Sequence, residues 1–281
     1  HPMLNTAVKA AREAAEIIQY GARNLDRLTV DSKGPGDFVS EIDRNAEAAI
    51  VDTLLGAYPS HGIIAEEGTG ATRGNPKSDH IWIIDPLDGT TNFLHGMPTY
   101  CVSIALQVEG KLTQAVIYDP NRNDLFTATR GSGAFMNNRR VRVSKTTKLR
   151  DALIGTGFPF RDGAAFDDYV TQFKNLMPKT AGLRRPGSAA LDLAYVAAGF
   201  YDGFWEMKLN QWDMAAGALL ILEAGGLVTG IDGEDTYMDS GAIVAGTPKI
   251  FPELLKILQI NDRVISFSLK SQFDVGFGRD K

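Results

Sequence analysis

A change in the pattern of apolar residues near residue 147 constrains the fold more than any other feature of the chain. Before it, apolar residues recur at three- and four-residue steps, which predicts helices over residues 4–18 and 42–54. Short apolar runs between turn residues then predict strands over residues 62–65, 80–84, 100–108, 112–118 and 125–129. Helices followed by paired strands indicate an α+β half.

Strand-like and helix-like segments alternate in the second half, which is typical of an α/β arrangement. The strand-like segments are residues 152–154, 203–205, 227–228 and 243–245, and the helix-like segments are residues 166–176, 188–198, 213–223 and 251–258. We therefore expect an α+β domain over residues 1–147 and an α/β domain over residues 148–265. Residues 266–281 form a tail to which the sequence assigns no role.

Composition narrows the class of protein. The net charge of −5 argues against non-specific coating of nucleic acid, although a small basic patch or a protein partner is compatible with it. The single cysteine, Cys101, indicates a reducing compartment and, with only four histidines, disfavours structural zinc. Any metal here is expected to be a hard one held by carboxylates. Without a targeting signal or the ~18-residue apolar run that spans a bilayer, we expect a soluble, cytoplasmic protein.

The stretch over residues 82–92 carries the most chemical information. We expect a buried strand to deliver Asp85 at its carboxyl end and Pro86 to stop that strand. Asp88 can then turn back toward the same point. Gly89 allows close approach of the backbone, and the segment after it can open a helix whose amides favour an anion. Two carboxylates this close would repel unless a divalent cation lies between them.

Each acidic residue also has an ordinary structural interpretation. Asp-Pro and Asp-Gly pairs are usually only turns, and acidic residues at a strand end, such as Glu66, are usually solvated. Asp213 is most simply the residue that caps a helix, and Asp43 a first-turn helix charge. The combination at these spacings favours a metal site.

In combination, these residues resemble the inositol monophosphatase family of lithium-sensitive, magnesium-dependent phosphatases, over roughly residues 4 to 260. The matching blocks are residues 37–40 with Asp43, residues 65–67, 82–92, 187–190 and 212–217, and residues 223–226. Residues 118–120, 123–131 and 156–160 are similar to bacterial inositol-1-monophosphatases. The resemblance implies a layered αβαβα sandwich of the inositol monophosphatase and fructose bisphosphatase type, and a homodimer.

The resemblance also implies roles for individual residues. The implied ligands of two or three Mg²⁺ are Glu66, Asp85, the carbonyl of Leu87, Asp88 and Asp213. The implied catalytic set is Glu66 and Thr90, with Asp43 holding Thr90. The implied substrate contacts are Asp88, Gly89, Thr90, the backbone of Ala189, and Glu206. Gly68 departs from the family, which often has Ser or Thr there, and this change leaves the metal ligands intact.

The function implied by the resemblance is hydrolysis of myo-inositol monophosphate by metal-activated water. Other members cleave a nucleoside bisphosphate, fructose bisphosphate or histidinol phosphate, and these remain alternatives. A metal-binding module without catalysis is disfavoured because Thr90 accompanies the full ligand set.

A different class of function follows from the bacterial members, which are associated with transcription antitermination through RNA polymerase and NusA. Candidate contact charges are Arg184 and Arg185, and Arg139, Arg140 and Arg142. Their simpler interpretation is as solvated strand ends or salt bridges in a dimer interface. The chain carries no motif for sequence-specific nucleic-acid binding and no sign of a membrane partner.

Overall fold

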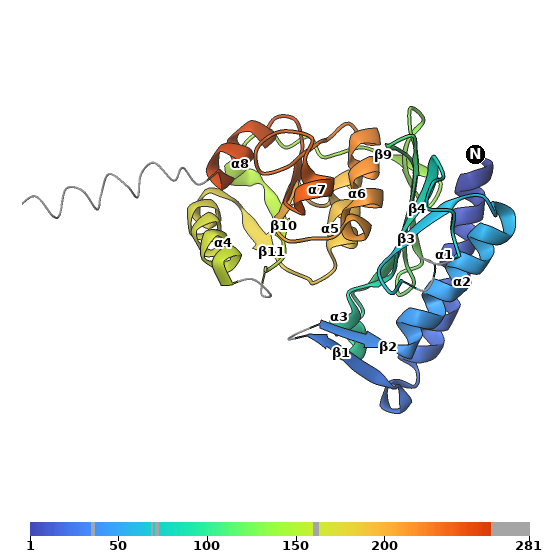
Figure 1. Ribbon diagram of the computed structural model, residues 1–281. Coiled ribbons are helices and arrows are strands. Elements are labelled where there is room, and N and C mark those ends of the chain that lie inside the picture. The colour runs from blue at the N-terminus through green and yellow to red at the C-terminus, as the bar shows by residue number, and fades with distance from the viewer. Residues whose placement is uncertain (35–36, 69, 71–72, 160–162, 260–281) are drawn as a thin grey trace, which may run out of the picture.

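Helices and sheets alternate in five layers (Figure 1). The computed structural model describes residues 1–34, 37–68, 70, 73–159 and 163–259. One pair of helices covers the outer face of a seven-stranded sheet, a second pair lies between this sheet and a five-stranded one, and a third pair covers the far side. In that order the pairs are α1 (Pro2–Ala22) with α2 (Glu41–Ala57), α5 (Ala189–Ala198) with α6 (Gln211–Glu223), and α4 (Gly163–Leu176) with α8 (Phe251–Leu258). The expected αβαβα sandwich is confirmed.

Helix α2 begins where the sequence predicts, because Ser40 and Asp43 form a capping box. The backbone amide of Ser40 donates to the Asp43 carboxylate at 2.8 Å, and the amide of Ile42 donates to the Ser40 hydroxyl at 3.2 Å. Small side chains on α1, among them Ala11 and Ala14, are fully buried and allow the two helices to pack closely. The first turn of α2 is therefore fixed, and Asp43 with it.

The seven-stranded sheet is a meander with one parallel strand at its edge. Its order is β3-β4-β5-β6-β7-β8-β9, with β3 parallel to β4 and all other pairs antiparallel. The bounds are β3 (Gly62–Ala65), β4 (His80–Asp88), β5 (Cys101–Val108), β6 (Lys111–Asp119), β7 (Asp124–Thr129), β8 (Gly133–Met136) and β9 (Arg139–Val141). The five strands that the sequence predicts here are present, and β8 and β9 extend the sheet.

Strand β4 does not end before Pro86, contrary to our expectation. It continues to Asp88, and its register with β5 changes between the pairs Asp85–Ser103 and Asp88–Cys101. This interval spans three steps on β4 and two on β5, so β4 carries a β-bulge of one residue. A bulge leaves a backbone N–H outside the ladder, and Pro86, which has no N–H, is tolerated there.

The five-stranded sheet is mixed. In the order β11-β10-β12-β14-β13, β10 is parallel to both of its neighbours, and β14 is antiparallel to both of its own. The bounds are β10 (Leu153–Thr156), β11 (Gly182–Arg184), β12 (Gly203–Glu206), β13 (Leu227–Thr229) and β14 (Ile243–Gly246). The alternation of strands and helices expected for this half is present.

A few short elements complete the described chain. They are the hairpin β1 (Val30–Gly34) and β2 (Asp37–Ser40), the helices α3 (Thr90–Leu94) and α7 (Tyr237–Ser240), and 3₁₀ turns at Leu25–Arg27, Leu149–Asp151 and Met177–Lys179. The sequence did not predict the hairpin, because its strands lack a clear apolar alternation. The predicted tail, residues 266–281, lies outside the described residues.

The largest apolar cluster occupies the middle of the sandwich and takes residues from both halves of the chain. Phe126 of the first sheet, Leu193 of α5 and Met214 of α6 are among its fully buried members. Burying a side chain of this size contributes about 1.5–3 kcal/mol. The division of the chain at residue 147 stays a prediction, while the shared cluster fixes α5 and α6 against the first sheet. No helix of the described residues is both long and apolar enough to cross a bilayer.

Candidate metal centre and active site

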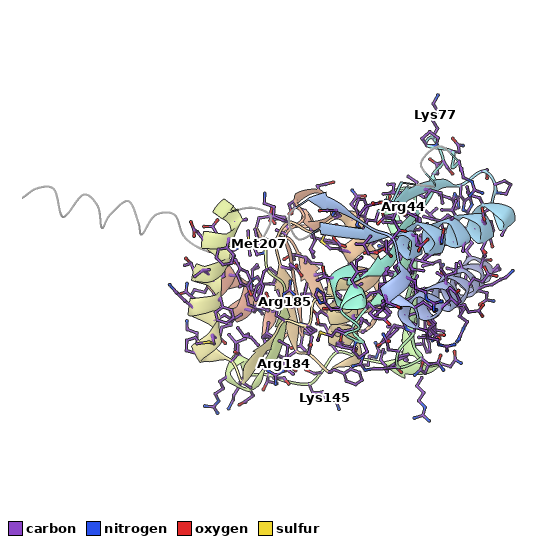
Figure 2. The ribbon with its side chains drawn as sticks, turned by 90° about the horizontal axis from the view of Figure 1, so that it is seen from below. Arg44, Lys77, Lys145, Arg184, Arg185 and Met207 are labelled. Carbon is purple, nitrogen blue, oxygen red and sulfur yellow. The ribbon has the colours of Figure 1, made fainter. Side chains whose placement is uncertain are left out.

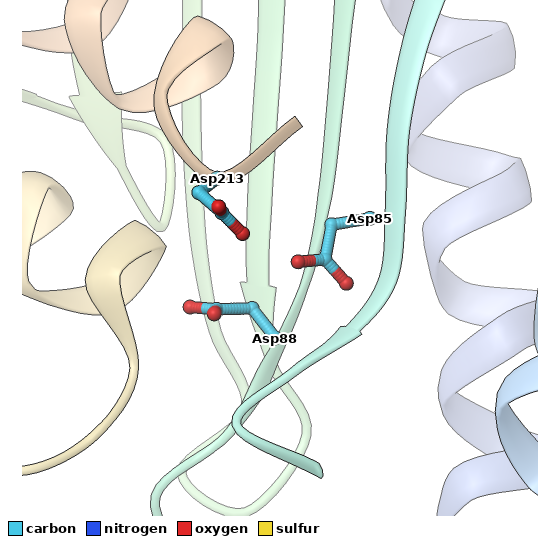
Figure 3. Close-up of side chains that lie close together, drawn as sticks. All are labelled: Asp85, Asp88 and Asp213. Atoms are coloured by element: carbon cyan, nitrogen blue, oxygen red, sulfur yellow. The ribbon is translucent and has the colours of Figure 1, made fainter. Parts of the chain in front are cut away.

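Three carboxylates from two distant parts of the chain meet at one point. One oxygen from each of Asp85, Asp88 and Asp213 lies within 4.8 Å of the other two. Figure 3 shows the three side chains lying close together, two from the end of β4 and one from the start of α6. The bulge in β4 brings Asp85 and Asp88 together, since it changes the direction of the strand between them.

Asp213 is held by the start of α6. Its ordinary interpretation as the residue that caps this helix is wrong. The helix begins at Gln211 with Asn210 as its N-cap, and Asp213 is its third residue. The amide of Asn210 donates to Asp213 Oδ2 at 2.7 Å. This bond helps to fix the orientation of the Asp213 carboxylate at the start of the helix.

Asp88 is held by the start of α5. Its Oδ2 accepts a hydrogen bond from the Ser188 hydroxyl at 2.5 Å and another from the amide of Ala190 at 2.8 Å. Ser188 and Ala190 belong to a block that resembles the family, yet no role is predicted for either of them from the sequence. No periodicity predicts this contact, because it joins residues about one hundred positions apart.

Glu66 lies beside the cluster, immediately after β3. Its backbone amide donates to the carbonyl of Ile84 at 3.2 Å, which places it next to Asp85 across the parallel pair β3–β4. The charge of Glu66 is also among the causes that raise the pKa of Asp85. The backbone of Leu87 runs between Asp85 and Asp88, and its amide donates to Asp85 Oδ1 at 3.0 Å.

Burial and mutual repulsion disfavour the charged forms of the carboxylates in this cluster. Burial, followed by the charges of Glu66, Asp88 and Asp213, raises the pKa of Asp85 well above its ordinary range. Burial raises the pKa of Asp88 to about 6, and burial together with Asp88 raises that of Asp213 to about 8. A divalent cation would remove this penalty, and carboxylate oxygens are the ligands that hard cations prefer. The residues therefore fit a magnesium site.

Thr90 and Asp43 are in direct contact at the edge of the cluster. Thr90 is the first residue of α3, and its Oγ1 donates to Asp43 Oδ1 at 2.9 Å, with the carbonyl of Leu87 3.1 Å away. Asp43 Oδ2 accepts from Ser40, so both of its oxygens have partners. Burial raises the pKa of Asp43, while the bonds from Ser40 and Thr90 lower it. The capping box of α2 thus orients the Thr90 hydroxyl.

A cavity of about 330 Å³ opens over these residues. Every residue that the sequence predicts for the site borders it, apart from Asp43, which lies behind Thr90. Glu206 extends from the end of β12 over Gly157, where a Cβ atom would lie 2.0 Å from its carboxylate. Ala189, the first residue of α5, also borders the cavity, as does Asp192, for which the sequence predicted no role.

Of the basic residues that the sequence singled out, only Arg185 borders the cavity. Arg139, Arg140 and Arg142 are exposed. Arg184 is exposed at the end of β11, and the Arg185 guanidinium stacks 4.7 Å from the ring centre of Phe158 at the border of the cavity. Figure 2 shows Arg184 and Arg185 in the second half of the molecule, far from Arg44 and Lys77 of the first.

Comparison with known proteins gives the same family along nearly the whole chain. The family profile described as "Inositol monophosphatase family" matches residues 1–263. The Nus factor SuhB of Pseudomonas aeruginosa is 52% identical over 260 residues, which cover 92% of this chain and 96% of that protein. The inositol-1-monophosphatase of Mesorhizobium japonicum is 48% identical over 257 residues, covering 92% and 96%.

A solved structure supports the same relationship. The extragenic suppressor protein SuhB from Bartonella henselae superposes with a TM-score of 0.89 at 45% identity, covering 93% of this chain and 100% of that one. The fold, the acidic cluster and the extent of these matches agree, and the chain belongs to the inositol monophosphatase family.

Proposed function

We propose that the protein is a magnesium-dependent phosphomonoesterase that hydrolyses myo-inositol monophosphate to inositol and phosphate. The observation that carries the proposal is the convergence of Asp85, Asp88 and Asp213, with Thr90, whose hydroxyl is held by Asp43, bordering the same cavity. Family membership and the inositol-1-monophosphatase named among the relatives support the substrate.

The metal-binding part of the proposal uses oxygen ligands only. Two or three Mg²⁺ would be held by Glu66, Asp85, Asp88, Asp213 and the carbonyl of Leu87. When bound, Mg²⁺ supplies positive charge that offsets the phosphate dianion and lowers the pKa of water. Lithium is proposed as an inhibitor that competes for this oxygen-ligand set.

The protein's own groups would bind the phosphate and direct the nucleophile. The first amides of a helix have no partner within it, so those at Gly89 and Thr90 are suited to phosphate oxygens. Because the Thr90 hydroxyl donates to Asp43, its lone pairs can accept a hydrogen bond from water and aim that water at phosphorus. Glu66, which borders the same cavity as Thr90, would orient the same water. We propose direct attack by water without a phosphoenzyme.

The leaving alcohol would lie at the other end of the cavity. Here the backbone of Ala189 and the carboxylate of Glu206 can hydrogen-bond its hydroxyl groups. A change of Glu206 to Ala is expected to alter the preference among sugar phosphates with a smaller loss of rate than a change at the carboxylate cluster. An unaltered preference would contradict this role.

The experiment that tests the proposal is a substrate panel with and without Mg²⁺. Its members are myo-inositol 1-phosphate, a nucleoside bisphosphate, fructose 1,6-bisphosphate and histidinol phosphate. We expect inositol phosphate to give the highest kcat/KM, and chelation of Mg²⁺ to abolish turnover. In water enriched in oxygen-18, a single turnover should label the product phosphate. Unlabelled phosphate would contradict direct attack by water.

A second function is supported by the names of relatives. We propose that the protein also acts in transcription antitermination through RNA polymerase and NusA, since the 52% identical relative from Pseudomonas aeruginosa is a Nus factor. Exposed arginines, including Arg139 and Arg184, are candidate contacts. A variant that lacks phosphatase activity yet supports ribosomal RNA synthesis would separate the two functions. A homodimer, expected from the family, is tested by sedimentation.

A further inference from the structure

Asp192 lies in the first turn of α5, and the proposed mechanism leaves it without a role. Asp192 is 1% exposed, and it borders the same cavity as Ala189 and Glu206. Asp192 follows Ala189 by three residues, so the two share one face of the helix. The face that presents Ala189 to the cavity therefore presents the Asp192 side chain as well.

One oxygen of this buried carboxyl group lacks a hydrogen-bond partner within the described part of the chain. Oδ1 of Asp192 is inaccessible to solvent and accepts nothing, whereas the Tyr201 hydroxyl donates to the carboxyl group. Two other buried carboxylates described above, Asp43 and Asp88, are supplied with donors by Ser40 and Ser188. A buried polar atom without a partner is costly, and such atoms in native proteins are satisfied by water or by a ligand.

Asp192 is close enough to both Glu206 and Asp88 for their charges to act on it. After burial, Glu206 and then Asp88 raise its pKa, and Arg185 lowers it. Glu206 is the residue proposed to contact the hydroxyls of the leaving alcohol, and Asp88 belongs to the carboxylate cluster. An alcohol bound in this part of the cavity would lie beside the Asp192 residue.

We propose that the Asp192 side chain turns toward the cavity when substrate binds and hydrogen-bonds a hydroxyl group of the alcohol portion, as a specificity-determining contact in addition to Ala189 and Glu206. This inference rests on the proposed function and narrows its substrate class to phosphates of polyols with several neighbouring hydroxyls. An aryl phosphate has no hydroxyl to offer and would leave Oδ1 unpaired. A site built to hydrogen-bond a hydroxyl discriminates against ligands that lack one.

The test removes the Asp192 oxygens in a background without the Tyr201 hydroxyl. Asp192→Ala alone would leave that hydroxyl without its acceptor, so Tyr201→Phe is the reference and Asp192→Ala/Tyr201→Phe is the test variant. Tyr201 itself does not border the cavity. Asp192→Asn/Tyr201→Phe is the matched control, since an amide can hydrogen-bond a hydroxyl from the same position.

The kinetic readout is kcat/KM for myo-inositol 1-phosphate divided by kcat/KM for 4-nitrophenyl phosphate. We expect this ratio to fall about tenfold from the reference to the test variant, because one hydrogen bond is lost with one substrate only. The Asn control should restore most of the ratio. An unchanged ratio, or an equal loss with both substrates, would overturn the inference and indicate a purely structural role.

A binding readout keeps this inference separate from the proposed function. In the presence of phosphate and Mg²⁺, myo-inositol should raise the Tm of the reference variant and should raise that of the test variant much less. Equal shifts in the two variants, or no shift in the reference, would overturn the inference even if the protein turned over neither phosphate ester. A lack of magnesium-dependent turnover by the unaltered protein would contradict the proposed function alone.

Discussion

At the scale of single residues, the two oxygens of Asp88 are used differently. Oδ2 is engaged by Ser188 and Ala190, and a metal ion would leave those bonds intact if it bound Oδ1. An Asn in this position can still accept both bonds through its carbonyl oxygen, but it removes one negative charge from the proposed ligands. Asp88→Asn therefore removes the negative charge while keeping the hydrogen bonds to Ser188 and Ala190.

Asp88→Asn is expected to lower kcat at saturating Mg²⁺ by at least ~10²–10³-fold, the typical effect of losing one preorganised electrostatic contact. Its circular dichroism spectrum should match that of the parent. Asp168→Asn, at an exposed position of α4, serves as the control and should keep the parental rate. A near-normal rate in Asp88→Asn would show that its charge is not needed.

Thr90 permits a second prediction at this scale. Thr90→Ala removes the hydroxyl held by Asp43, and general acid–base or water-orienting groups contribute about 10²–10⁴-fold to rate. We expect kcat to fall within this range while the concentration of Mg²⁺ needed for half-maximal activity stays the same. Thr90→Ser, which keeps the hydroxyl, should retain most of the activity. Equal losses in both variants would argue against a role for the hydroxyl.

At the scale of elements, the turn from β4 into α3 depends on Gly89. Its φ of +98° is a conformation that side chains with a Cβ rarely adopt, and a Cβ here would lie 2.9 Å from the carbonyl oxygen of Thr99. Gly110 also has a positive φ, of +77°, but its Cβ would meet no atom within 4 Å. A substitution at Gly110 therefore tests the cost of the backbone conformation alone, and one at Gly89 tests that cost together with a steric contact.

Gly110→Ala is expected to lower the free energy of unfolding by about 1 kcal/mol, the cost of an unfavourable backbone conformation. Gly89→Ala should lower it by clearly more, because the Cβ also displaces the segment at Thr99. Urea denaturation of the metal-free variants measures both values. Similar losses would mean that the close approach at Gly89 contributes nothing.

Elements were the part of the structure that the sequence predicted best. Periodicity and capping residues located α1, α2 and α8, because these signals are local. Pro86 was misread, since whether a proline ends a strand or occupies a bulge depends on the partner strand. The approach of Asp213 to Asp85 was expected only through family resemblance, because no local signal records how helices pack between sheets. For the same reason, the sequence predicts no role for Asp192.

At the scale of the whole molecule, the carboxylate cluster makes stability depend on pH in a defined direction. The pKa of Asp88, about 6, and that of Asp213, about 8, lie above their ordinary value of 3.8 in the folded, metal-free protein. The folded state thus binds more protons than the unfolded state between about pH 4 and pH 8. Stability is fully present below this range and is lost as the pH rises through it.

The metal-free protein is therefore expected to have a higher free energy of unfolding at about pH 5 than at about pH 8.5. The rise for Asp88 from 3.8 to about 6 alone corresponds to about 3 kcal/mol. Mg²⁺ binds the deprotonated carboxylates, so adding it should stabilise the protein far more at the higher pH. Denaturation with EDTA or Mg²⁺ at both pH values measures this. A metal-free protein that gained stability toward pH 8.5 would contradict the pKa assignments.

The position of α5 and α6 between the sheets has a consequence for motion. Helix α6 carries Asp213, α5 holds Asp88, and both pack on the first sheet as well as the second. Sliding of the layers past one another would separate Asp213 from Asp85, so an ion that prefers all three carboxylates also selects one alignment of the sandwich. Binding of the ion and resistance to sliding of the layers are therefore expected to be thermodynamically linked.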